Sequence, residues 1–393
     1  MRYYRGRIKA PFYLLRKQTM TDMIYDFYCS ECGEGYNFKE DHKCGEKPEP
    51  YQPIIFYADE LSNEDYHKDE DHISGTSLWK MYQLCLAKWR YEDSEEKRQK
   101  SKALVFGTTS HAMMLEPERF DAEFFRMPCP EDYTIRDDEG NVTFAPLTSV
   151  AAMQRWAKER GLAGRSNSDP VALAETIRQA VISSQDNGGD EVMPVFWHEV
   201  EKAAKEEACE RVQVPAEDFD KCMRMREVIL NNPQYHRVIH GGKSEVSVFF
   251  ELFGVKVKVR WDRLTDDGEI WDYKTTDSCQ TDKFRRKAFD LGYHMKMALQ
   301  FHAFRAVWGS NPKGVVLLAQ EKDAPFIPEE FRMTRKTLLI GTAALRQALA
   351  MYKFAKDNNH WTTYGGGNPI DLDPPFYVER EFKHLWEDLE TAK

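Results

Sequence analysis

Two aspartates and a lysine are spaced so that one β-hairpin could bring them together. Asp262 ends an alternating stretch, and Asp272 and Lys274 lie two residues apart in the next stretch. Side chains two residues apart in a strand share a face, so both would lie beside Asp262, with Glu245 one strand away. Carboxylates bind Mg²⁺ or Mn²⁺, which can polarise a phosphate, and a lysine can orient the attacking water. The pattern predicts phosphodiester hydrolysis, and the alternative is an ordinary antiparallel meander with a solvated polar face.

Three short strands joined by tight turns are expected to position these residues. Residues 245–251 are rich in Val and Phe, residues 255–262 alternate, and residues 269–275 follow a turn at Thr265–Gly268. The second strand would place its valines on one face and these charged side chains on the other: Lys256, Lys258, Arg260 and Asp262. The basic members of this row are either phosphate contacts that guide DNA into the site or part of a solvated strand face.

Five segments in a fixed order resemble the exonuclease VIII family, the recombination exonucleases of phages and prophages. They are GTTSHAMMLEP at 107–117, SEVSVF at 244–249, VRWDRL at 259–264, DYKTT at 272–276 and YHMKMA at 293–298. The RWD and WDYK segments are similar to the D…D-x-K core of the PD-(D/E)xK nuclease superfamily. The resemblance implies an α/β fold of the restriction-endonuclease-like type, with a mixed central sheet flanked by helices.

The resemblance also implies roles for individual residues. A lone histidine on an apolar helix is usually a satisfied core residue, but His111 occupies the place of a metal ligand in the family motif. Lys274 would position the attacking water, and Glu245 would support the metal or the substrate. The metal, Mg²⁺ or Mn²⁺, would be held by these groups: His111, Asp262, Asp272 and the backbone carbonyl of Tyr273.

A long helix over residues 288–308 is expected to contact DNA near the metal. Tyr293, Lys296 and Gln300 fall on one stripe of this helix. Many RecB-like nucleases carry Gln-x-x-x-Tyr there, and this sequence departs from the pattern, because Lys296 takes the place of the Gln and Gln300 the place of the Tyr. The departure concerns the DNA contacts and leaves the expected metal ligands unchanged.

Four soft or borderline metal ligands are grouped near the amino terminus. They are Cys29, Cys32, His42 and Cys44, and a Cys-x-x-Cys pair followed by glycine is typical of a structural zinc knuckle. The spacing of the second pair is tighter than usual, and the alternative is that these cysteines are free intracellular thiols. Either outcome is independent of the nuclease prediction.

The totals indicate a folded intracellular protein, and the resemblance to phage exonucleases implies the cytoplasm of a bacterial host cell. Of its 393 residues, 41% are hydrophobic and 13% aromatic, and no apolar run is long enough for a membrane span. The net charge of −10 argues against non-specific coating of nucleic acid, so DNA contacts would be confined to a local basic groove. The resemblance offers a setting for such a groove, because the family assembles as homo-oligomeric rings around DNA.

We divide the chain into an amino-terminal segment at 1–50, an acidic linker at 51–72, an exonuclease domain at 73–355 and a tail at 356–393. Residues 126–215 would be a helical insertion in the exonuclease domain. The resemblance implies digestion of double-stranded DNA ends in the 5′-to-3′ direction, leaving 3′ overhangs for a single-strand annealing recombinase. The alternatives are a single-strand or flap-processing nuclease, and a catalytically silent DNA- or protein-binding module built on the same fold.

Overall fold

A computed structural model describes residues 27–28, 35–36, 51–94, 102–366 and 368–391. Its centre is a seven-stranded mixed sheet in the order β13-β12-β11-β10-β9-β3, with β4 pairing β10. The pairs β11–β12 and β10–β4 are parallel, and the other pairs are antiparallel. The strands are β3 (Ile54–Phe56), β4 (Ile73–Ser74), β9 (Lys243–Leu252), β10 (Val255–Leu264), β11 (Glu269–Thr276), β12 (Gly314–Glu321) and β13 (Pro328–Arg332).

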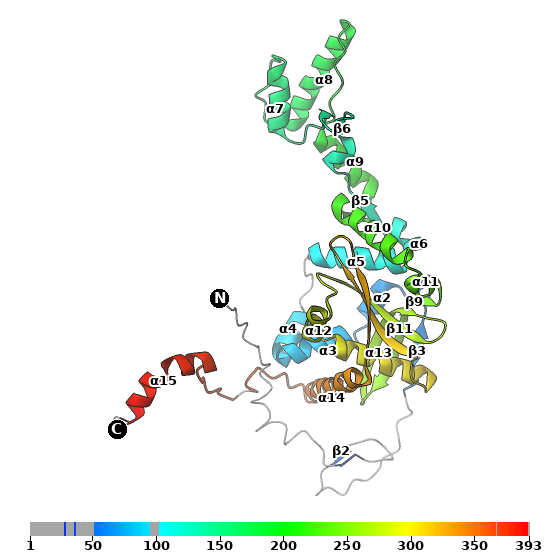
Figure 1. Ribbon diagram of the computed structural model, residues 1–393, viewed down its shortest axis with the longest axis vertical. Helices are drawn as coiled ribbons and strands as arrows, with labels where there is room; N and C mark the ends of the chain where they lie inside the picture. The colour runs from blue at the N-terminus through cyan, green and yellow to red at the C-terminus, as the bar shows by residue number, and fades with distance from the viewer. Residues whose placement is uncertain (1–26, 29–34, 37–50, 95–101, 367, 392–393) are drawn as a thin grey trace.

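Helices cover both faces of this sheet (Figure 1). On one face, apolar side chains of β9, β10 and β12 pack against α3 (Gly75–Gln83), α13 (Tyr293–Trp308) and α14 (Arg335–Asp357). On the other face, Trp271 and Tyr273 pack against α5 (Lys102–Leu115), α10 (Ala216–Leu230) and α11 (Pro233–His240). The three expected catalytic strands and the expected mixed sheet flanked by helices are confirmed.

Residues 51–72, which we call the strap, pack on the sheet, so the prediction of an acidic linker with little structure of its own is wrong. β3 pairs with β9, and α2 (Asn63–Lys68) is capped by Ser62. Tyr66 of this helix is 6% exposed, and its ring meets that of Phe249 at 5.9 Å. The strap is stable because a buried aromatic side chain and backbone pairing offset the entropy of ordering it. The many acidic residues of this segment had instead indicated a solvated linker.

Residues 124–214, which we call the arm, project from the body of the molecule (Figure 1). The arm joins the body through the parallel pair β5 (Phe124–Arg126) and β8 (Val212–Val214). Its three longest helices, α7 (Val150–Glu159), α8 (Pro170–Asp186) and α9 (Trp197–Ala208), follow a β6 (Ile135–Arg136) and β7 (Val142–Phe144) hairpin. Side chains of α7 and α8 form a core of their own with Leu147 and Phe196.

The remaining described elements lie around this framework. They are β1 (Phe27–Tyr28), β2 (Gly35–Tyr36), α4 (Leu86–Ser94), α6 (Pro117–Glu123), the 3₁₀ turn η1 (Pro130–Tyr133), α12 (Thr281–Asp290) and α15 (Phe376–Thr391). The candidate zinc ligands Cys29, Cys32, His42 and Cys44 lie outside the described residues. Among the helices that the structure describes, none is both long and apolar enough to cross a bilayer.

Candidate metal-binding site

The candidate site lies where β10 and β11 separate. The two strands pair only beside their connecting turn, at Arg263 with Trp271 and at Leu264 with Ile270. Beyond these pairs the strands diverge, and the backbone N–H of Tyr273 is turned to the Asp262 carboxylate, to which it donates over 2.8 Å. The divergence leaves room between the strands for side chains that would otherwise be kept apart by a ladder.

The pairing of β9 with β10 is also interrupted at the site. Trp261 pairs with Val246 and Arg263 pairs with Ser244, but Glu245 and Asp262, which stand opposite each other in the same register, do not form a ladder pair. Glu245 has a φ of 51°, in the left-handed region that costs a residue with a side chain about 1–2 kcal/mol. The side-chain alternation changes here, because Trp261 and Leu264 both pack into the same core. The change in alternation falls between Trp261 and Leu264, beside Asp262.

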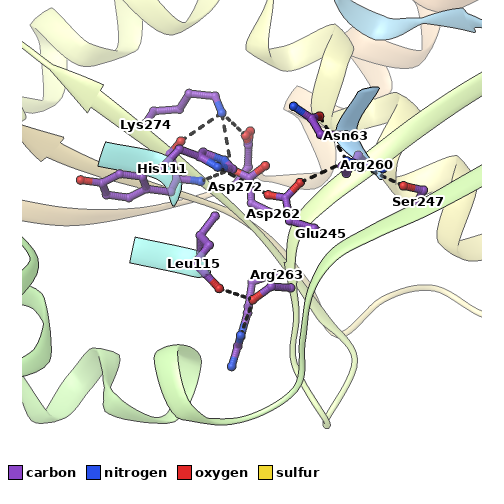
Figure 2. A network of polar contacts seen from close by, with 12 residues as sticks. Asn63, His111, Leu115, Glu245, Ser247, Arg260, Asp262, Arg263, Asp272 and Lys274 are labelled. Atoms are coloured by element: carbon purple, nitrogen blue, oxygen red, sulfur yellow. Dashed lines mark hydrogen bonds and ion pairs between the residues drawn. The ribbon is translucent and has the colours of Figure 1, made fainter. Parts of the chain in front are cut away.

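His111 reaches these carboxylates from α5, on the covering layer. Its Nε2 lies 2.7 Å from Asp262 Oδ2, and its Nδ1 lies 3.5 Å from Glu245 Oε1 (Figure 2). One potential ligand atom from each of these three residues falls within 4.8 Å of the others. Met114 and Leu115 pack against the sheet and fix the position of α5. His111 lies one helical turn before them, so its side chain is directed at the strands. Residues more than 130 positions apart are therefore brought together.

Asp272 and Lys274 form the adjoining part of the site, on β11. The Lys274 ammonium forms an ion pair with Asp272, and it lies 3.7 Å from Asp262 Oδ2. It also donates to the Tyr273 carbonyl over 3.0 Å. The five side chains expected to act together therefore converge: His111, Glu245, Asp262, Asp272 and Lys274. Asp272 and the Tyr273 carbonyl contact the lysine and are not part of the cluster of three candidate ligands.

Burial and charge give these groups unusual proton affinities. Burial lowers the pKa of His111, but the Asp262 charge and hydrogen bond outweigh it and raise that pKa to about 9. Burial raises the pKa of Glu245 to about 7. Burial also acts to raise the pKa of Asp262, but the charges of His111 and Lys274 hold it at about 2. Without metal at neutral pH, the imidazolium therefore neutralises Asp262.

The lysine and the second aspartate are linked in the same way. Burial acts to lower the pKa of Lys274, but the charges of Asp272 and Asp262 raise it above its usual range. Burial and the charge of Asp262 raise the pKa of Asp272, against the opposing effect of Lys274. The lysine therefore stays an ammonium, able to act through its charge and its N–H donors.

The donor set fits a divalent cation. Carboxylate oxygens and an imidazole nitrogen suit Mg²⁺ or Mn²⁺, and the Oε1 atom of Glu245 is buried with no hydrogen-bond partner among the described residues. A buried carboxylate oxygen without a partner is costly, and a cation would satisfy it. His111, Glu245 and Asp262 are the residues that could hold the ion.

Of the three basic residues on β10 that were expected to contact DNA, two are used inside the protein. Lys258 is 5% exposed, and its Nζ donates to the Tyr66 carbonyl over 2.7 Å and pairs with Asp69 at 3.1 Å. These are strap groups, so Lys258 fixes the strap and the prediction of a phosphate contact is wrong. Lys256 is exposed on the same strand and remains a predicted DNA contact.

Arg260 is likewise bound internally, which corrects its predicted role. It donates to Ser247 Oγ over 2.7 Å and to the strap at Asn63 Oδ1 and the Leu61 and Ser62 carbonyls. Its guanidinium lies 3.8 Å from Glu245 Oε2, so it adds positive charge beside the candidate ligand. The physical reason is shared with Lys258: the strap covers the strand face that the sequence indicated to be open.

The α13 residues occupy different environments. Tyr293 and Lys296 lie near the candidate site, where burial and the Lys274 charge lower the pKa of Lys296. Gln300 is 8% exposed, and its Oε1 has no hydrogen-bond partner among the described residues. Its burial contradicts a direct DNA contact, because a helix packed on the sheet turns that position inward. Tyr293 and Lys296 remain predictions.

Several residues that shape the site were not predicted from the sequence. Glu116 follows α5, and its charge contributes to the raised pKa of Glu245. Arg263 and Ser244 flank Asp262 and Glu245 in the chain and form hydrogen bonds with each other. These residues lie close in the sequence to the predicted ligands, and this closeness was the only indication of their role. Their residue types alone do not distinguish them from solvated polar residues.

Comparison with known proteins identifies a family. The model of the family described as "PDDEXK-like domain of unknown function (DUF3799)" matches residues 75–369. A solved structure of a protein from Eubacterium rectale, described as a "putative exonuclease", is 13% identical to the chain with a TM-score of 0.46. The match covers 81% of this chain and 97% of that chain. No curated protein matches the chain significantly.

Proposed function

This chain belongs to the PDDEXK-like family DUF3799, and from this membership we propose that it is a metal-dependent nuclease that hydrolyses DNA from an end. The observation that carries the proposal is the meeting of His111 with Glu245 and Asp262, within 4.8 Å, beside an ion-paired lysine. An imidazole, two carboxylates and an ammonium are costly to bury together, and titratable groups with shifted pKa values cluster at functional sites.

His111, Glu245 and Asp262 would hold the cation, with Asp272 and the Tyr273 carbonyl as further candidate ligands. Bound there, Mg²⁺ or Mn²⁺ would polarise the scissile phosphate and lower the pKa of a water. The Lys274 ammonium lies at the edge of this cluster, 3.0 Å from the Tyr273 carbonyl. From there it can orient the attacking water and offset the negative charge that develops on the phosphate. Lys256, Tyr293 and Lys296 would contact the DNA.

The finer features rest on the resemblance to exonuclease VIII. They are 5′-to-3′ digestion of double-stranded DNA, release of a 3′ overhang to a single-strand annealing recombinase, and assembly as a ring. Zinc binding by the amino-terminal cysteines is a separate proposal, tested by metal analysis of the purified protein. One equivalent of zinc that is lost in a Cys29→Ser/Cys32→Ser variant would support it.

The nuclease proposal is tested with end-labelled duplex, single-stranded and flap DNA in Mg²⁺ or Mn²⁺. We expect digestion of the duplex from its 5′ end, inhibition by a chelator, and a rate at least ~10³-fold lower for Asp262→Asn. Asp282→Asn, which changes an exposed acid on α12, is the matched control and should retain the rate.

Other results would select the alternatives. Digestion restricted to single strands or flaps would favour a flap-processing nuclease. Absence of digestion at every end, with DNA binding unchanged in Asp262→Asn, would reject catalysis and favour a binding module on this fold.

A further inference from the structure

The three elements that carry the candidate ligands are joined by a second set of residues, each close in the chain to a ligand. Arg263 follows Asp262 on β10, and Ser244 precedes Glu245 on β9. Leu115 lies four residues after His111, one turn along α5. A contact between these residues therefore fixes how far apart the ligands stand.

Such a contact exists as a continuous chain of hydrogen bonds (Figure 2). The Arg263 guanidinium donates through Nη1 to Ser244 Oγ, and the Ser244 hydroxyl donates to the Leu115 carbonyl over 2.9 Å. The serine hydroxyl is thus both acceptor and donor. Its removal would break the hydrogen-bonded link between α5 and the two strands. The Leu115 carbonyl is one of the last four of its helix, which have no partner within the helix.

The same guanidinium also fixes the chain that leads into β9. Its Nη2 donates to the Ile239 carbonyl over 2.7 Å, and its Nε donates to the Gly241 carbonyl over 2.9 Å. These carbonyls lie at the end of α11, where a cation is favoured by the helix dipole. Arg263 is 9% exposed, and each of its three nitrogens donates a hydrogen bond to an oxygen atom, which offsets part of the cost of burying the charge.

This arrangement offers a reason why Glu245 persists in a left-handed conformation. A residue with unfavourable φ needs its neighbours to determine its position. Ser244 is held on one side by Arg263 and Leu115, and Val246 is held on the other by the ladder with Trp261. Only Glu245 is left between two fixed points, and its carboxylate is turned toward His111.

We propose that Arg263 and Ser244 form a clamp that sets the spacing of His111, Glu245 and Asp262, so that Arg263 is a positioning residue of the metal site. The inference rests on the proposed function, because it assumes that these three groups hold a cation. Neither clamp residue touches the ion. Their effect is on ligand geometry, and a loss of about 10–100-fold in metal affinity is typical when such supporting contacts are removed.

The test is a Mn²⁺ titration of the DNA-free protein, followed by calorimetry or by the spin-resonance signal of free Mn²⁺. Ser244→Ala and Arg263→Lys should weaken Mn²⁺ binding at least tenfold, and Ser244→Thr, which keeps the hydroxyl, should bind like the wild type. Arg126→Lys is the control, because Arg126 likewise bridges two groups, Asp132 in the arm and Asp220 on α10, neither of which is a candidate ligand. It should leave Mn²⁺ binding unchanged.

Thermal unfolding without metal separates positioning from general stability. If Ser244→Ala and Arg263→Lys unfold earlier but bind Mn²⁺ as tightly as the wild type, the clamp is merely structural and the inference is overturned. If Ser244→Ala does not fold, Arg263→Lys decides by the same criterion. If the wild type binds no Mn²⁺, the proposed metal site and the clamp fall together. Wild-type binding thus tests the function, and the ratio of variant to wild type tests the clamp.

Discussion

In the proposed site, a proton and a metal ion would compete for His111. Its imidazole lies 2.7 Å from Asp262, and this contact favours the protonated ring. Glu245, with a pKa raised by burial to about 7, also retains a proton more readily than an exposed glutamate. A metal ion can bind both side chains only after their protons leave.

This competition predicts a strong pH dependence of Mn²⁺ binding. From pKa values of about 9 and about 7, binding at pH 7 should release roughly 1.5 protons per ion, and at pH 9 roughly 0.5. Affinity should therefore rise with pH between 6 and 9, most steeply at the low end. Calorimetry in buffers of different ionisation enthalpy measures the proton release, and affinity independent of pH would contradict the assignment of these ligands.

The backbone of Glu245 predicts an unusual order of stability. With φ at 51°, Glu245→Gly should be about 1 kcal/mol more stable than Glu245→Ala, because glycine adopts the left-handed region without strain. The matched control is Glu251 on the same strand, which is exposed and absent from the positive-φ residues. There the order should reverse, with Gly less stable than Ala by about 0.5–1 kcal/mol. Chemical denaturation of the four variants measures their free energies of unfolding. The same order of Gly and Ala at both positions would contradict backbone strain at Glu245.

At the scale of elements, the strap changes the meaning of the basic strand face. Lys258 and Arg260 would be free to meet phosphates on a bare sheet, but the strap provides carbonyls for both and a carboxylate for Lys258. Tyr66 lies over them, with its ring 4.4 Å from the Arg260 guanidinium carbon. Their charge therefore stabilises the fold, and through Arg260 it also lies next to Glu245.

Loss of the Lys258 charge should destabilise the protein. Lys258→Met leaves Asp69 and two carbonyls without their buried partner, and we expect a loss of about 2–4 kcal/mol in the free energy of unfolding. Lys256→Met, two residues away and exposed, should change it by less than about 0.5 kcal/mol. Denaturant titration compares the two. If Lys258→Met were as stable as the wild type and its DNA binding less sensitive to salt, the result would support the original prediction that Lys258 contacts a phosphate.

At the scale of the whole molecule, the acidity is concentrated on the arm. Residues 124–214 contain 16 acidic and 10 basic side chains, a net charge of −6 out of −10 for the whole chain. The arm has its own apolar core and projects from the sheet, and no candidate metal ligand comes from it. A DNA-binding helical module is therefore not favoured there, since such modules carry clustered positive charge.

Removal of the arm should leave the metal site intact. Replacing residues 128–210 with a flexible linker of about ten residues retains β5 and β8, whose side chains belong to the core of the body. We expect Mn²⁺ affinity within about threefold of the full chain, because the ligands are held by α5, β9 and β10. A folded variant that no longer binds Mn²⁺ would show that the arm supports the site.

The sequence by itself determined the strands and their turns. Alternation at Val255, Val257 and Val259, with turn residues at Gly254 and Gly268, is a local pattern, and local patterns reflect which face of a strand is buried. The placement of Asp272 beside Lys274 follows from the same period of two residues. Resemblance to a family, and not periodicity, indicated His111.

Only the tertiary structure decided what these elements meet. Glu245 adopts a left-handed backbone conformation that no local pattern indicated, and the strap covers Lys258 and Arg260. The approach of α5 to the strands, through Leu115, Ser244 and Arg263, depends on contacts across more than 120 residues. No local pattern encodes such contacts, because their energy comes from packing and hydrogen bonds that exist only once the chain is folded.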